Sequence, residues 1–273
     1  MLCMSQEESH WERSGSMGLN ISQSSFSNWA SGGSTAFGLN FQSDYQANYQ
    51  HGRNMWQNRL ELAYGFNSEK GDRSQKTQDK IYLSTLYGYQ VKKYLYLGGS
   101  FDFRTQFANG FNYDSSPLEL ISQFMSPGYL TVGAGLIWKP KPYFSLVFNL
   151  ISWRGTFVLD DALSDAGAYG VDPGDKYRTD FGANLKADFN YWLMKNVNLY
   201  SRLELYSNYL DKPLNVDVLW DIQLNLVVNE WISVKLNTSL LYDDDVLIKQ
   251  DDGRMVHKVQ FKEILGVGLQ YTF

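Results

Sequence analysis

Hydrophobic and polar residues alternate with a period of two along most of this chain. The clearest stretch is the last one, 259–273, where the apolar residues on one side are Val259, Phe261, Leu265, Val267, Leu269, Tyr271 and Phe273. The intervening positions are polar or glycine. Alternation over about fifteen residues exceeds the roughly six residues of a typical soluble strand. Because about ten residues of tilted strand cross a bilayer, this stretch is long enough for a membrane-spanning strand.

The same alternation recurs from Ser16 onwards and predicts about twelve strands. Tight turns such as His51–Arg53 follow the even strands, and long loops such as 108–128 and 155–176 follow the odd ones. Short periplasmic turns and long outer loops are typical of outer-membrane barrels. The predicted fold is therefore all-β, a transmembrane antiparallel up-and-down β-barrel that spans residues 15–273.

A soluble β-sandwich is the main alternative, since its strands show the same alternation with the apolar face buried. Its strands would be shorter, and its loops would not sort into short and long by parity. These two features favour the barrel.

Composition agrees with a barrel. Aromatic residues make up 16% of the 273 residues and charged residues 19%, as aromatic girdles and a polar interior require. No apolar run approaches the roughly 18 residues of a membrane helix. The net charge of −5 argues against nucleic-acid binding. The single Cys3 excludes a disulfide framework and a thiolate metal cage, and no cofactor is expected.

Residues 1–14 are expected to form a periplasmic segment before the barrel. The start of the chain is too short for the apolar core of a signal peptide. Because an outer-membrane barrel is exported, we expect Met1–Ser5 to be the remnant of an export signal. Cys3 lacks the preceding apolar stretch of a lipoprotein signal.

Charged residues recur on the inward face of the predicted strands. A three-residue hairpin loop at Met194–Asn196 would place Asp188 opposite Arg202 and Lys186 opposite Glu204, two pairs of opposite charge. Such residues either form a charged constriction that selects solutes or neutralise one another and brace a sealed interior. The candidate lumen residues are Asp44, Arg59, Glu61, Asp102, Arg104, Arg178, Asp180, Lys186, Asp188, Arg202 and Glu204, with Asp221 and Lys235 on the same face.

The outer loops can decide whether the lumen is open, because a twelve-stranded barrel lies between filled eight-stranded barrels and open sixteen-stranded channels. A capping box at Ser116–Glu119, with Pro117 at the first helical position, predicts a short helix through Met125. Asp161–Ala166 predicts another. Either helix could plug the mouth, or the apolar loop residues could pack on one another above the rim.

Acidic residues are frequent in the predicted outer loops. Hard-cation binding is one reading, but the spacing fits no calcium loop and favours a solvated acidic surface. A catalytic role is not expected, since no serine motif accompanies His10, His51 or His257. The acidic residues are Asp160, Asp161, Asp243, Asp244, Asp245, Asp251 and Asp252.

Several segments together resemble a domain-of-unknown-function family of Gram-negative outer-membrane β-barrels. The resemblance runs from about Gly15 to the end and implies a bacterial outer-membrane location, with no catalytic residues and no substrate. A last strand that ends on Tyr271 and Phe273 also resembles the signal that the barrel-assembly machinery recognises. The matching segments are Gln23–Gly33, Phe101–Tyr113, Ser122–Leu130, Phe157–Val171, Ser207–Pro213 and Val259–Gly268.

Two functions follow from this pattern. The first is a narrow channel for small or charged solutes. The second is a closed barrel that serves as a structural or accessory subunit of a larger outer-membrane complex. Outer-membrane lipid, lipopolysaccharide and the assembly machinery are the expected partners, with further subunits in the second case.

Overall fold

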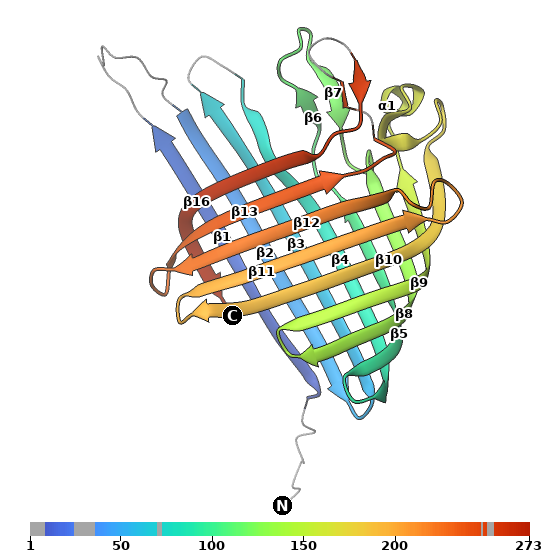
Figure 1. Ribbon diagram of the computed structural model, residues 1–273. Helices are drawn as coiled ribbons and strands as arrows, with labels where there is room; N and C mark the ends of the chain where they lie inside the picture. Colours follow the sequence, from blue (N-terminus) through green and yellow to red (C-terminus); the bar gives the residue numbers. More distant parts are fainter. Residues whose placement is uncertain (1–8, 25–35, 70–72, 247, 250–253) are drawn as a thin grey trace, which may run out of the picture.

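A computed structural model describes residues 9–24, 36–69, 73–246, 248–249 and 254–273. Twelve strands form one closed antiparallel barrel in the order β1-β16-β13-β12-β11-β10-β9-β8-β5-β4-β3-β2 (Figure 1). The predicted fold class is confirmed. The barrel strands are β1 (Trp11–Ser24), β2 (Ala36–His51), β3 (Asn54–Glu69), β4 (Gln75–Lys92), β5 (Leu95–Thr105), β8 (Gly128–Lys141), β9 (Phe144–Phe157), β10 (Tyr177–Met194), β11 (Val197–Asn208), β12 (Val216–Val227), β13 (Ile232–Tyr242) and β16 (Gln260–Thr272).

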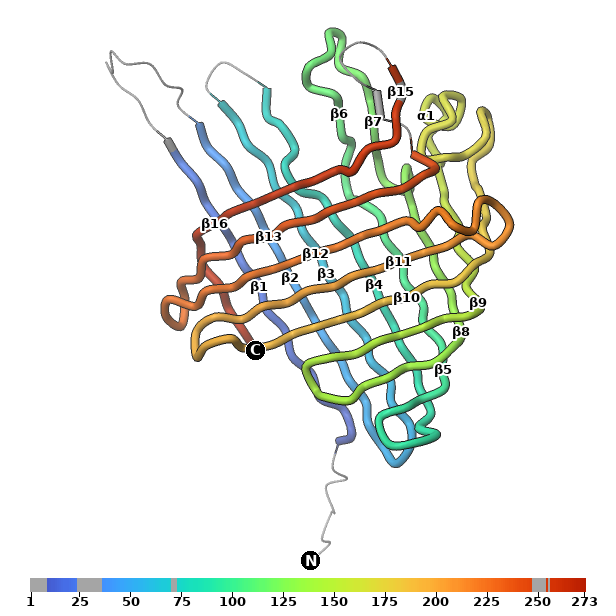
Figure 2. Tube along the Cα trace, viewed as in Figure 1, coloured from blue at the N-terminus to red at the C-terminus, as the bar shows by residue number. Residues whose placement is uncertain are grey.

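The two ends of the barrel differ. Tight turns join consecutive strands at one end, here called the turn end, and long connections lie at the other, the loop end (Figure 2). None of the helices in the described residues is long and apolar enough to cross a membrane. The loop-end connections contain β6 (Gly110–Asn112), β7 (Glu119–Ser122), α1 (Asp161–Asp165), η1 (Ala168–Gly170), β14 (Ile248–Lys249) and β15 (Met255–Val256).

The helix predicted from the capping box at Ser116–Glu119 is wrong. Glu119–Ser122 is a short strand, β7, that pairs antiparallel with β6. A single turn is a poor helix nucleus in isolation, and Leu120 packs on the apolar residues Val158 and Leu163 of the next loop. Backbone pairing and this contact therefore decide the conformation. The second predicted helix is confirmed as α1, with Asp160 as its N-cap.

The first strand begins earlier than the alternation predicts. β1 starts at Trp11 because residues 11–15 pair with Tyr45–Tyr49 of β2, and the Trp11 ring lies 5.5 Å from that of Trp56. The expected export remnant Met1–Ser5, the loop residues 25–33, and Asp251 and Asp252 lie outside the described residues.

The last strand closes the barrel against the first. β16 pairs with β1 from Ser16 and Thr272 to Asn20 and Gly268, and Gly15 and Phe273 exchange backbone hydrogen bonds of 2.8 and 2.9 Å. The Phe273 ring lies directly over Gly15, where an added Cβ would be 2.6 Å from Cζ of that ring. Glycine is therefore needed at position 15 for the terminal ring to pack on the sheet.

The outer surface of the barrel is apolar. Phe261, Leu265 and Val267 of β16 expose 64, 67 and 56% of their surfaces. Aromatic rings contact one another near the turn end, with Trp138 against Phe144, Tyr143 against Tyr191, and Trp231 against Tyr271. An apolar wall with an aromatic belt matches the lipid-facing surface of an outer-membrane barrel.

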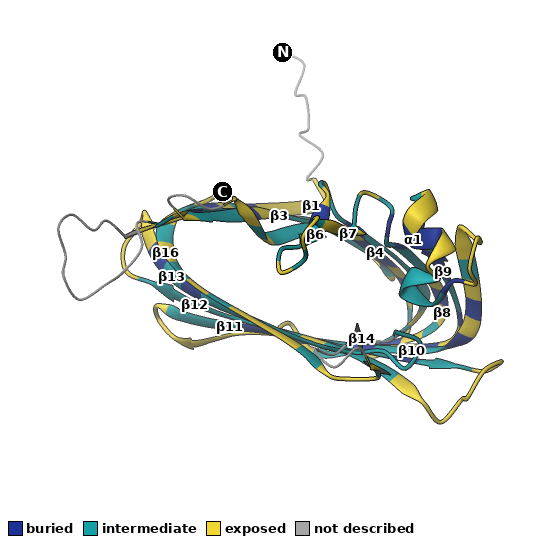
Figure 3. Cartoon of the chain, turned by 90° about the horizontal axis from the view of Figure 1, so that it is seen from above, coloured by how far each residue is buried: buried dark blue, intermediate teal, exposed yellow. Residues whose placement is uncertain are grey.

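The barrel is flattened rather than round. Seen along its axis, one long wall contains β3 and β4 and the facing wall contains β11 and β12 (Figure 3). In the strand order, five strands separate β3 from β11 in either direction, and the same holds for β4 and β12. Opposite walls therefore approach each other, which allows side chains to meet across the lumen.

Candidate functional site

The lumen contains two cavities in succession. The larger, of about 490 Å³, is lined by residues from all twelve barrel strands, including Asp44, Arg104 and Lys235. The smaller, of about 170 Å³, lies toward the turn end and is lined by Lys139, Tyr143 and Lys186 among others. Arg59 and Tyr200 line both. A layer of side chains that includes these two residues therefore separates the cavities.

Ion pairs cross the lumen within this layer. Nη1 of Arg202 on β11 lies 3.0 Å from Oε1 of Glu61 on the opposite strand β3. Nζ of Lys80 on β4 lies 2.6 Å from Oε2 of Glu61 and 3.9 Å from Oδ2 of Asp221 on the opposite strand β12. Charges on opposite walls thus neutralise one another and close the lumen at this height.

Glu61 is the centre of the layer. Its carboxylate accepts the Arg202 contact on Oε1, a 3.0 Å contact from Nε of Arg59 on the same oxygen, and the Lys80 contact on Oε2. Arg59 also pairs with Asp44 of the neighbouring strand. A carboxylate can accept about four hydrogen bonds, so three cations around Glu61 use most of its capacity.

Tyr82 fills the space beside the ion pairs and is fully buried. Its hydroxyl donates to Oδ1 of Asp102 at 2.6 Å. The guanidinium carbons of Arg104 and Arg202 lie 4.9 and 4.5 Å from its ring centroid. Such cation–π contacts add about 1 kcal/mol each where water is partly excluded, so the ring stabilises the two arginines inside the barrel.

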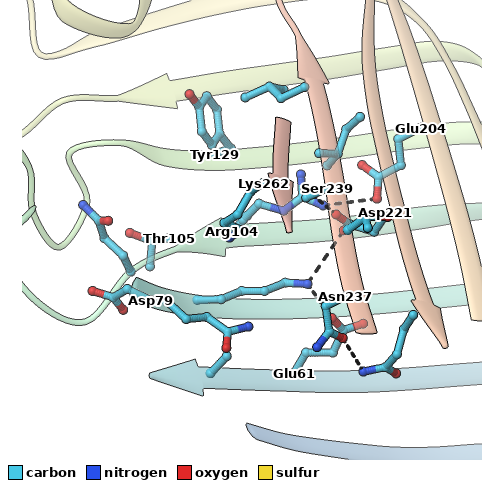
Figure 4. A pocket seen from close by; sticks show the side chains of 18 of the residues that line it. Glu61, Asp79, Arg104, Thr105, Tyr129, Glu204, Asp221, Asn237, Ser239 and Lys262 are labelled. Carbon is cyan, nitrogen blue, oxygen red and sulfur yellow. Dashed lines mark hydrogen bonds and ion pairs between the residues drawn. The ribbon is translucent and has the colours of Figure 1, made fainter. Parts of the chain in front are cut away.

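Arg104 and Glu204 extend the layer into the larger cavity, where they pair at 3.2 Å between β5 and β11. Figure 4 shows these two side chains together with Asp221 and Lys262 around the cavity. Lys186 of β10 pairs with Asp102 of β5 at 2.7 Å. Strands that are not neighbours in the sheet are therefore joined at several points through the lumen.

The cross-strand register predicted for β10 and β11 is confirmed. Lys186 lies opposite Glu204 and Asp188 opposite Arg202. Only the second pair makes direct contact, at 3.0 Å. Lys186 and Glu204 turn instead to Asp102 and Arg104 across the lumen. The reason is the flattened cross-section, which offers each of them an oppositely charged partner on another wall.

Arg178 and Asp180 lie apart from this layer, near the loop end. Nη2 of Arg178 is 3.0 Å from Oδ1 of Asp180 and 2.8 Å from Oδ2 of Asp245, a residue of the loop that follows β13. These contacts tie that loop to the wall. The other predicted candidates, Asp44 to Glu204, gather in or beside the central layer.

Acidic residues crowd the rim of the larger cavity. Asp217 pairs with Arg154 at 2.6 Å, and Asp243 lies close by. Burial, followed by the charge of Asp217, raises the pKa of Asp243 to about 6. Asp244 accepts from Lys212 and Asn215, which lower the pKa of its carboxyl. Among the described residues no acidic or histidine cluster has the geometry of a metal site.

A small apolar core fills the lumen near the turn end on the side of β8 and β9. It contains Met55, Leu86, Ile137 and Val147, with Tyr96 packed against it. At the loop end, Leu120, Val158, Leu163, Val171 and Tyr169 pack on one another. In the view along the axis, α1 lies at the rim beside β8 and β9 rather than over the opening (Figure 3).

Sequence reasoning did not include Lys80, Tyr82 and Tyr200 among the candidates. The signal was available in the strand parity, because outward-facing Ile81 and Leu83 place Lys80 and Tyr82 inward. Tyrosines were overlooked because aromatic residues are expected on the lipid face. Here Tyr82 and Tyr200 carry hydroxyls that reach the lumen carboxylates of Asp102 and Asp188.

The three histidines are not brought together. The rings of His10 and His51 lie 4.1 Å apart at the turn end, whereas His257 lies in the loop-end connection before β16. His10 and His51 therefore belong to the aromatic contacts around Tyr49.

With the fold and lumen described, comparison with known proteins places part of the chain. Residues 21–111 match the model of a family described as "Protein of unknown function (DUF3078)". The match confirms, over these residues, the resemblance to a domain-of-unknown-function family. Comparison with curated proteins finds no match.

Solved structures similar to this chain are outer-membrane β-barrels. The translocator domain of autotransporter NalP from Neisseria meningitidis has 11% identity and a TM-score of 0.41, over 99% of this chain and 91% of that one. The COG4313 outer membrane channel from Pseudomonas putida F1 has 12% identity and a TM-score of 0.41, over 95 and 94%. The NanC porin has 11% identity and a TM-score of 0.41, over 94 and 98%.

Proposed function

We propose that this chain is an outer-membrane barrel that conducts small solutes along a narrow path through its two cavities. The proposal rests on one observation: polar cavities lie on both sides of a thin layer of side chains that includes Arg59 and Tyr200. A barrel that served only as a scaffold would gain stability from a filled interior, as in the small barrels. Here apolar packing fills only part of the lumen.

The layer of ion pairs is the gate of this path. Solute passage requires Arg202 and Lys80 to leave their partners Glu61 and Asp221 on the opposite walls. Long, flexible side chains reorient on the picosecond to nanosecond timescale where solvent reaches them. The charges of both signs in the layer also make it the position where solutes are selected.

Single-channel conductance in a planar lipid bilayer tests this function. The refolded chain is expected to show small, steady openings, and the double variant Glu61→Ala/Arg202→Ala is expected to show larger ones because the crossing pair is removed. Glu230→Gln, at the exposed turn between β12 and β13, should conduct as the unmodified chain does. A folded barrel that is silent in all three forms would refute the channel.

A second function, a closed accessory subunit, is favoured by the loop end. Phe124, Leu210 and Leu214 there expose 55, 77 and 95% of their surfaces. Exposed apolar residues of this kind suit a protein partner. Mild detergent extraction followed by size measurement would support this function if the chain co-migrates with another outer-membrane protein. Its release as a lone monomer would count against it.

A further inference from the structure

One lumen lysine is buried without an acidic partner. Lys235 of β13 is 6% exposed and lines the larger cavity. Among the described residues it makes no ion pair and no hydrogen bond, unlike Arg59, Lys80, Arg104, Lys186 and Arg202, which are all paired. A buried ammonium without a partner loses solvation and gains nothing in return. Such a group is poised to bind an anion.

The nearest acidic group does not fill this role. Asp44 acts on Lys235 electrostatically, but its carboxylate is held by Arg59 of the neighbouring strand through Nε and Nη2. The cross-strand partner of Lys235 on β12 is Asn225, which is uncharged. All three donor positions of the Lys235 ammonium are therefore open to a ligand.

The wall beneath Lys235 has little side-chain bulk. Its partner on β16 is Gly266, and on β1 an added Cβ at Gly18 would lie 3.4 Å from the lysine Nζ. The side chain therefore lies flat across β16 and reaches β1. This arrangement leaves room above the ammonium for a small group from the cavity.

A second donor lies two residues further along the same strand. Asn237 faces the cavity, and its Oδ1 accepts from Nε2 of Gln223 at 2.8 Å. That bond fixes the amide orientation and leaves the Nδ2 hydrogens unused among the described residues. Residues two apart on a strand share a face at about 7 Å, a spacing that lets one anionic group reach both side chains.

We propose that Lys235 and Asn237 form a binding site for the anionic group, a carboxylate or a phosphate, of a small solute. The proposal deepens the proposed function by giving the charge of the solute. The cavity of about 490 Å³ falls within the roughly 300–1,000 Å³ of small-ligand sites. Lys262, which also lines the cavity and makes no ion pair among the described residues, adds positive potential along the wall.

Isothermal titration calorimetry of the refolded barrel in detergent tests the site without requiring conduction. Succinate and inorganic phosphate are the two probes, and butane-1,4-diol is the neutral analogue of succinate. At least one anion is expected to bind, and the probe that binds identifies the source of the anionic group. Lys235→Gln should weaken binding by about tenfold or more, Lys235→Arg should retain it, and the diol should not bind.

Lys195→Gln is the matched control, because it removes the same charge from the turn between β10 and β11 outside the lumen. Circular dichroism and protease resistance establish that each variant folds. Equal affinity in Lys235→Gln and the unmodified chain, or no binding of either anion, would overturn the site. Conductance without anion binding would refute this site alone, and anion binding by a silent barrel would refute the channel alone.

Discussion

Arg202 and Glu61 meet at 3.0 Å although their strands, β11 and β3, lie on opposite sides of the barrel. The contact requires a flattened cross-section, and it closes the lumen between two polar cavities. Arg202 is 4% exposed and also contacts Asp188 at 3.0 Å. The pair therefore links the shape of the barrel to the path that a solute would take.

Glu61 is expected to stabilise the folded barrel through its three cationic neighbours. Glu61→Gln leaves Arg202, Arg59 and Lys80 with less negative charge, and loss of one partner from a buried ion pair costs about 3 kcal/mol. Urea unfolding in lipid vesicles should show a decrease of that order in the free energy of unfolding. Glu230→Gln should change it by less than about 0.5 kcal/mol, and equal effects of the two substitutions would contradict this role.

Gly15 is expected to be required for barrel closure. Gly15→Leu places a side chain where the Phe273 ring now lies, and overpacking of this kind costs about 1–3 kcal/mol. Urea unfolding of protein refolded in vitro measures the effect separately from cellular assembly. In a Phe273→Ala background the same substitution should cost less, because the ring is gone. An undiminished cost would show that the ring does not fill that position.

Asp243 is expected to make the stability of the barrel depend on pH. Its pKa in the folded state is about 6, above the value of about 3.9 for an unfolded Asp. The folded state therefore binds this proton more tightly. The associated stability is fully present below pH 4 and is lost as the pH rises through 6.

Asp243→Asn removes this dependence. At pH 8 the variant should be more stable than the unmodified chain by about 2 kcal/mol, at roughly 1.4 kcal/mol per pKa unit and with allowance for partial solvent screening. Unfolding measured from pH 4 to pH 8 checks the slope. Asp172→Asn, at an exposed loop residue, should leave the slope unchanged. A slope that persists in Asp243→Asn would assign it to another group.

Asp160 is expected to hold the loop-end cluster together. Its Oδ1 accepts from the Leu163 backbone N–H at 2.9 Å, and its Oδ2 accepts from Nε2 of Gln123 at 3.0 Å. Loss of an N-cap costs about 1 kcal/mol, here together with a contact between two loops. Asp160→Ala should speed proteolysis of the loop that contains α1.

Asp161→Ala is the control for Asp160. The Asp161 side chain is 84% exposed and pairs only with Lys176, and such surface pairs contribute little. It should leave the rate of cleavage close to that of the unmodified chain. Equal cleavage of the Asp160→Ala and unmodified chains would show that the cap does not hold this loop.

The sequence by itself determined the barrel. Alternation fixes which side of each strand meets lipid, so Phe261 and Leu265 had to face outward and Lys186 and Arg202 inward. The hairpin spacing then set Asp188 opposite Arg202. These are local consequences of a period of two and of turn length. The short helix at Asp161 was equally local, since its cap lies one residue away.

Only the tertiary structure decided which charges meet. Arg202 finds Glu61 and Arg104 finds Glu204 because the barrel is flattened, and no spacing within one strand or hairpin encodes that shape. The same holds for β7, whose residues adopt a strand through contacts with a separate loop. It holds most clearly for Lys235, which alternation places inward but which lacks a partner because Asp44 is taken by Arg59. Pairing inside a lumen depends on distances between walls, and closure of the whole sheet sets those distances.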